Sequence, residues 1–69
     1  MALTFSVYRS KTGPRFPDLL TSVPRASAER FARERSAADP EGRTWVVERD
    51  AGWRAVAEYR NGQLIRRLN

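Results

Sequence analysis

The sequence predicts a single small α+β domain, spanning residues 1–69, in which one helix packs on one face of a four-stranded, mainly antiparallel sheet. Three features indicate this class: alternating apolar and polar residues near the start, helical spacing in the middle, and an Asn-Gly pair between two strand-like runs near the end. The predicted order of elements is strand, helix, strand, strand and strand. A chain of this size buries only roughly 60% of its surface, so we expect a thin core.

The first predicted strand covers residues 3–8, where apolar and polar side chains alternate with the period of two that is typical of a half-buried strand. We expect Leu3, Phe5 and Val7 to face the core. Two prolines and a glycine in residues 10–17 then predict a loop, because these residue types interrupt regular structure.

The next stretch, residues 18–24, is short and bounded by prolines, which is compatible with a helical turn. After it, apolar side chains recur at helical spacing, while arginines and glutamates four residues apart lie on the opposite side. This pattern predicts a helix that begins at Pro24 or Ser27 and ends at Ala37. Ser27 is a candidate N-cap, and Pro24 is the alternative first residue of the helix. The turn-forming residues 39–42 then end it.

The last two strands are predicted from Asn61-Gly62, because both residues tolerate the positive φ that a type I′ hairpin turn requires. This turn sets the register of the strands on either side of it. The expected pairs are Arg60 with Gln63, Tyr59 with Leu64, Glu58 with Ile65, Ala57 with Arg66, Val56 with Arg67, and Ala55 with Leu68. In this register one face of the hairpin is apolar except for Arg66.

Two loop lengths are considered for the turn before this hairpin, and they differ in the face on which Glu48 would lie. A two-residue Ala51-Gly52 loop would place Glu48 opposite Ala55 on the apolar face and bury its charge. A three-residue loop over residues 50–52, with Gly52 in the left-handed conformation, avoids this. The pairs expected from it are Val47 with Ala55 and Trp45 with Ala57 inward, and Glu48 with Arg54 outward.

The aromatic rings expected in the core, rather than in a ligand cage, are those of Phe31, Trp45, Trp53 and Tyr59.

The positive charge of the chain is concentrated at its two ends. The net charge is +5, from twelve arginines and one lysine against eight acids, and residues 1–16 and 60–69 contain no acid. Such ends favour contact with phosphates, so nucleic acid is the first partner that we expect. The alternatives are an arginine-rich composition that follows from a GC-rich genome, and a role in keeping a small protein soluble. The candidate nucleic-acid contacts are Arg9, Lys11, Arg15, Arg60 and Arg67.

A second candidate surface is the sheet face that points away from the helix. In the predicted register Val46, Val56 and Ile65 form an apolar stripe there, with Arg54 among the flanking charges. An exposed apolar stripe favours a protein contact, either with a second copy in a homodimer or with a host protein. The chain would then be a regulator or inhibitor of the kind that phages and other mobile elements encode. The alternative is that these β-branched residues are present because they favour strands.

The residue types missing from the sequence argue against catalysis. The chain has no histidine and no cysteine, so it lacks the commonest general base, the usual activated nucleophiles and the best ligands for transition metals. We expect no enzyme activity, no cofactor and no bound metal. The apolar runs are too short to cross a membrane, and no segment has the pattern of a signal peptide. The expected location is the cytoplasm.

Overall fold

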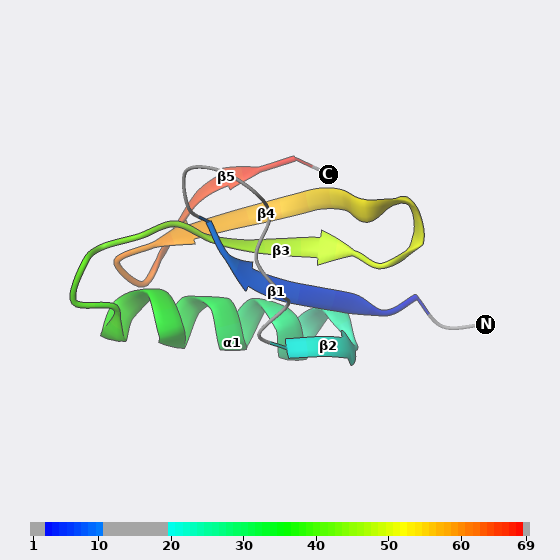
Figure 1. The fold of residues 1–69 in the computed structure, drawn as a ribbon, viewed down its shortest axis with the longest axis horizontal. Coiled ribbons are helices and arrows are strands. Elements are labelled where there is room, and N and C mark those ends of the chain that lie inside the picture. The colour runs from blue at the N-terminus through cyan, green and yellow to red at the C-terminus, as the bar shows by residue number, and fades with distance from the viewer. Residues whose placement is uncertain (1–2, 11–19, 69) are drawn as a thin grey trace.

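The computed structural model describes residues 3–10 and 20–68, except for the side chain of Trp53. In these residues one helix packs on one face of a five-stranded sheet in which all neighbouring strands are antiparallel, in the order β2-β1-β3-β4-β5 (Figure 1). The predicted α+β class is confirmed, with one strand more than expected. The elements along the chain are β1 (Phe5–Arg9), β2 (Leu20–Val23), α1 (Arg25–Ala38), β3 (Trp45–Arg49), β4 (Arg54–Arg60) and β5 (Gln63–Arg67).

The additional strand, β2, forms where the sequence was compatible with a helical turn. Pro24 disfavours helical backbone at the residue before it, so Val23 is extended. The strand pairs with β1, with Val23 opposite Phe5 and Leu20 opposite Val7. Both apolar residues of β2 are partly buried against the core. The expected helical turn is therefore wrong, and this segment forms one border of the sheet.

Helix α1 begins directly after Pro24, whose extended backbone (φ −62°, ψ 158°) makes it the N-cap residue. Ser27 lies inside the first turn, so the expected cap at Ser27 is wrong. The helix ends one residue beyond the predicted end, at Ala38. Its fully buried side chains are small, which lets the helix approach the strands closely and leaves space for the large rings of the sheet. The buried helical residues are Ala28, Ala32 and Ser36.

The core lies between α1 and the sheet. Trp45 is buried, and its ring meets that of Phe31 edge-on with the centroids 6.2 Å apart. The expected inward position of Trp45 is thus confirmed, whereas that of Trp53 falls on a side chain outside the described part of the structure. Leu3 precedes β1 and is 53% exposed, so its expected place in the core is wrong. The buried residues that the sheet contributes to this core are Phe5, Val7, Trp45, Val47, Val56, Ala57 and Tyr59.

The connection between β3 and β4 is longer than expected. Asp50 and the short 3₁₀ turn Ala51–Trp53 join the strands, and Gly52 has the left-handed conformation expected of it, with φ +82°. The register then shifts by one residue because β4 contains a bulge at Val56. The observed pairs are Arg49 with Arg54, Glu48 with Ala55, Val47 with Ala57, Val46 with Glu58 and Trp45 with Tyr59. The expected pairs of Val47 with Ala55, Trp45 with Ala57 and Glu48 with Arg54 are therefore wrong.

Asp50 accounts for the longer turn. Its carboxylate accepts hydrogen bonds from the hydroxyl groups of Thr4 and Ser6, and its N–H donates to the carbonyl of Thr4 at 3.1 Å. These contacts hold Asp50 beside β1, and its helical backbone (φ −61°, ψ −41°) begins the turn directly after β3. The hydrogen bonds from Ser6 and then Thr4 stabilise the carboxylate and lower the pKa of Asp50.

The hairpin of β4 and β5 begins as the sequence predicts. Asn61 and Gly62 both have positive φ, at 53° and 80°, and the expected pairs of Arg60 with Gln63 and Tyr59 with Leu64 are confirmed. A second bulge then makes Ile65 an extra residue in β5. The observed pairs beyond it are Glu58 with Arg66 and Ala57 with Arg67, and the N–H of Leu68 donates to the carbonyl of Val56 at 2.9 Å. The pairs expected for Glu58, Ala57, Val56 and Ala55 are wrong by one residue.

Candidate interaction surface

The most exposed strand of the described sheet is β5, the red strand that forms one of its two borders (Figure 1). All five of its residues are exposed. Leu64, Ile65 and the following Leu68 are 39%, 50% and 40% exposed, which places three large apolar side chains in water at one border of the sheet. Clustered apolar exposure of this kind is typical of interaction surfaces, whereas single exposed apolar residues are ordinary.

The main chain of β5 has an open side. Leu68 bonds to Val56 of the neighbouring β4, and successive residues of an antiparallel strand turn their N–H and C=O groups to opposite sides. The N–H and C=O of Arg67 therefore point away from β4. Because β5 is the last strand in the order of the described sheet, these groups face its open border.

The bulge at Ile65 decides which face of the sheet each arginine of β5 occupies. Arg67 lies opposite Ala57, a residue of the helix-covered core, and Nη1 of Arg67 is 3.5 Å from Oε2 of Glu29 on α1. Arg66 lies opposite Glu58, on the other face. In the register without a bulge these two side chains would exchange faces. One arginine therefore lies on each face of the sheet at this border.

Glu29 links the helix to the last two strands. Its carboxylate accepts a hydrogen bond from Nε of Arg25 at 2.7 Å and one from the hydroxyl group of Tyr59 at 3.3 Å, in addition to the ion pair with Arg67. Burial raises the pKa of Glu29, but the hydrogen bond and charge of Arg25, followed by the charge of Arg67, lower it by more. Burial, and then the charge of Glu29, raise the pKa of Tyr59. These contacts connect α1 to β4 and β5.

The turn of the hairpin is fastened to the end of the helix. The N–H of Gly62 donates to Oγ of Ser36 at 2.9 Å, and Ser36 in turn donates to the carbonyl of Arg33 at 3.0 Å. A Cβ on Gly62 would lie 2.9 Å from Cβ of Ala37, so only glycine fits against the helix here. β5 is thus held at the turn by Ser36 and near its other end by the pair of Arg67 with Glu29.

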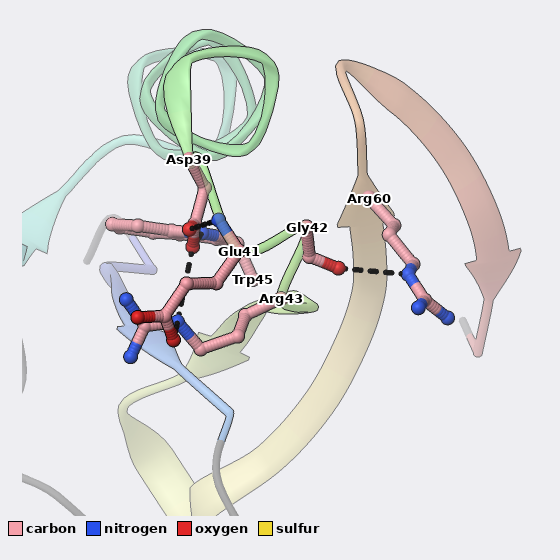
Figure 2. A network of polar contacts seen from close by, with 6 residues as sticks. All are labelled: Asp39, Glu41, Gly42, Arg43, Trp45 and Arg60. Carbon is pink, nitrogen blue, oxygen red and sulfur yellow. Dashed lines mark hydrogen bonds and ion pairs between the residues drawn. The ribbon is translucent and has the colours of Figure 1, made fainter.

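Figure 2 shows a polar network at the connection between α1 and β3. The buried carboxylate of Asp39 accepts hydrogen bonds from Nε1 of Trp45 and from the N–H of Glu41, both at 2.9 Å, and lies 3.4 Å from Nε of Arg43. The bond from Trp45, then that from Glu41, lower the pKa of Asp39. In the same figure Nε of Arg60 donates to the carbonyl of Gly42 at 2.8 Å. This network fixes the connection, and its groups are engaged with one another.

The predicted nucleic-acid contacts are only partly brought together. Arg60 and Arg67 lie on the same hairpin. Arg9 lies at the end of β1 opposite Trp45, and the strands β3 and β4 separate it from β5, which corresponds to about 14 Å at normal strand spacing. Lys11 and Arg15 are outside the described residues.

The predicted apolar stripe on the outer face is mostly wrong. Val46 is 5% exposed and Val56 is 3% exposed, so neither is available to a partner. Val56 is buried because the bulge in β4 brings it into the core cluster. Ile65 is exposed as expected, and Arg54 is exposed but lies at the end of β4 far from the Asn61-Gly62 turn.

Sequence reasoning missed three residues of this border: Leu64 and Leu68, which it placed over the core, and Arg66. A signal for them was present, since Arg66 was the single charged residue on a face predicted to be apolar. A charge at an inward position indicates that the register is wrong nearby. The bulge at Ile65 removes the conflict by moving Arg66 to the other face.

No protein-family model, curated protein or solved structure matches this chain. Within residues 3–10 and 20–68, no group of three or more acidic side chains is placed to hold a metal ion. In the same residues, no helix has the length and apolar character needed to cross a membrane.

Proposed function

We propose that the chain is a non-catalytic binding module that recognises a protein partner through its C-terminal border. We name this surface the β5 border and define it by Leu64, Ile65, Arg66, Arg67 and Leu68. The observation that supports it is the exposure of three large apolar side chains, two on β5 and one directly after it, at the border of the described sheet. The partner class fits a regulator or inhibitor that acts by occupying a surface of another protein.

The charges at this border favour a protein over a polyanion. Arg67 already pairs with Glu29, and Glu58 lies directly opposite Arg66, so two carboxylates stand close to the cations that a phosphate would approach. Nε of Arg60 is engaged with the carbonyl of Gly42. Mixed charge around an apolar centre is the composition typical of protein interfaces.

Nucleic acid is a second candidate, and the position of Arg66 favours it. Arg66 is exposed on β5, and Arg60 is exposed at the end of the neighbouring β4, within a chain of net charge +5. Phosphates would be contacted by these two guanidinium groups without any base-specific contact. Such binding would weaken steeply with salt, which distinguishes it from an apolar protein contact.

The proposal of a module without catalysis is supported by the absence of histidine and cysteine from the sequence and by the roles of the perturbed carboxylates. Asp39, Asp50 and Glu29 each stabilise a connection of the fold through several hydrogen bonds or ion pairs. A cytoplasmic location is also proposed, since a cysteine-free domain gains nothing from an oxidising compartment.

The test is site-specific photo-crosslinking from two positions in a host lysate. A photoreactive residue at Ile65 should give a defined adduct that contains polypeptide, survives nuclease and is competed by excess unmodified protein. The matched control carries the same residue at Arg30, which is exposed on α1, and should give no such adduct. An adduct from Ile65 that nuclease removes would support the nucleic-acid candidate, and equal adducts from both positions would contradict a specific surface.

A further inference from the structure

The open side of β5 offers a main-chain template as well as side chains. Arg67 presents an N–H and a C=O to the border, and an extended segment laid alongside could accept and donate hydrogen bonds there. Strand addition of this kind obtains affinity from main-chain bonds and specificity from the side chains on either side.

β5 is held in place before any partner arrives. The bond of Gly62 to Ser36 fixes its beginning, and the ion pair of Arg67 with Glu29 fixes its end. A template that is already ordered avoids most of the entropic cost of forming a strand at the moment of binding.

Resting on the proposed protein-binding function, we propose that the β5 border takes an extended, acidic segment of the partner as a sixth strand. Arg66 is exposed on the face of the border away from the helix, so acids on that face of the added strand would meet its guanidinium group, while Arg67 on the other face stays paired with Glu29. Apolar residues between those acids would cover Leu64, Ile65 and Leu68.

A second copy of the chain fits this border less well than an acidic segment. In an antiparallel pairing of two β5 strands centred on Ile65, the two Arg66 side chains would be diagonal neighbours. Centring the pair on Arg66 would place them directly opposite each other. Each copy also carries a net charge of +5, so the two domains repel as they approach. The arginines and the net positive charge thus discourage self-pairing and favour an oppositely charged strand.

The probe for this proposal is a capped heptapeptide of alternating valine and glutamate. Two matched peptides separate the contributions: one with lysine in place of glutamate, and one with every backbone nitrogen methylated, which keeps the charges but cannot donate main-chain hydrogen bonds. Binding is followed by amide chemical shifts and hydrogen exchange on the intact 69-residue chain. The acidic peptide should slow exchange of the Arg67 N–H, while the N–H of Leu68, already bonded to Val56, should change little.

Protein variants test the same contact without disturbing the core. Arg66→Ala should weaken binding of the acidic peptide about three- to tenfold, and Ile65→Thr, which keeps β-branching, should weaken it by a similar factor. The matched control Arg30→Ala removes the same charge from the exposed side of α1 and should stay within about twofold of the unchanged protein.

The other outcomes overturn the proposal in distinguishable ways. Equal binding of the methylated peptide would show charge pairing without strand addition, and would leave the proposed protein-binding function standing. Protection of Arg67 that appears on concentrating the protein alone would identify a second copy as the occupant. Binding of a 20-base-pair DNA duplex that displaces the acidic peptide at physiological salt would favour nucleic acid, and would contradict the proposed function as well. Absence of acidic-peptide binding at millimolar concentration would overturn the proposal that β5 takes an acidic strand.

Discussion

The backbone N–H of Gly62 donates to Oγ of Ser36, 2.9 Å away, and this contact joins the tightest turn of the sheet to the last turn of the helix. Gly62 has no side chain, and a Cβ built on its Cα would lie 2.9 Å from Cβ of Ala37. The type I′ turn therefore requires glycine for two separate reasons, its positive φ and the close approach of the helix.

Gly62→Ala should destabilise the domain by about 2–3 kcal/mol, because it combines backbone strain at positive φ with a clash against Ala37. Gly52→Ala is the matched control. Gly52 has nearly the same φ, +82°, but nothing lies within 4 Å of its Cβ position, so strain alone should cost about 1 kcal/mol. The free energies of unfolding come from urea titrations monitored by circular dichroism. Equal losses for the two variants would show that the helix does not press on the turn.

Trp45 should be strongly protected from a water-soluble quencher. The residue is 6% exposed, its ring packs against that of Phe31, and its indole N–H donates to Asp39. In a Trp53→Phe variant Trp45 is the sole tryptophan, so acrylamide quenching reports on it alone. Trp45→Ala should lower the free energy of unfolding by about 3–5 kcal/mol. Quenching as efficient as that of free tryptophan would contradict the buried position.

Stability should fall in acid. Asp39, Asp50 and Glu29 have pKa values lowered by their hydrogen bonds and ion pairs, so the unfolded chain binds more protons than the folded chain as the pH decreases. The stabilisation is fully present above the unfolded pKa values, near 4, and is lost as the pH falls through the lower folded pKa values. Asp50→Asn should flatten this dependence of unfolding free energy on pH. An unchanged slope would mean that the bonds from Thr4 and Ser6 do not favour the charged form.

The part of the fold that local chemistry dictates could be predicted from the sequence. Asn61-Gly62 specified a type I′ turn and the two residue pairs beside it, and the apolar spacing after Pro24 specified the helix. β2 was missed because Leu20–Val23 is short, and its pairing with β1 depends on contacts across the chain rather than on its own pattern.

The bulges in β4 and β5 limited prediction of the candidate surface. Val56 and Ile65 are β-branched residues that favour a regular strand as much as a bulge, so their residue types do not indicate where a bulge lies. Each bulge shifts the register by one residue, and a shift of one residue exchanges the two faces of a strand. This is why Val56 left the predicted stripe and why Arg67 reached Glu29. Val46 keeps its predicted face, opposite Glu58, but is only 5% exposed.

If the chain binds nucleic acid, the salt dependence of that binding should identify the arginines involved. On duplex DNA each lost phosphate contact lowers the slope of log affinity against log salt by about 0.9. Arg66→Ala and Arg60→Ala should each approach this value, because both side chains are exposed on the hairpin of β4 and β5. Arg67→Ala should change the slope less, since Glu29 already neutralises much of its charge at 3.5 Å. Arg30→Ala on the exposed side of α1 is the control and should leave the slope unchanged. A slope reduced equally by all four substitutions would indicate diffuse attraction to the whole domain, and absence of binding at low salt would exclude the nucleic-acid candidate, leaving the partner of the β5 border to be sought among proteins.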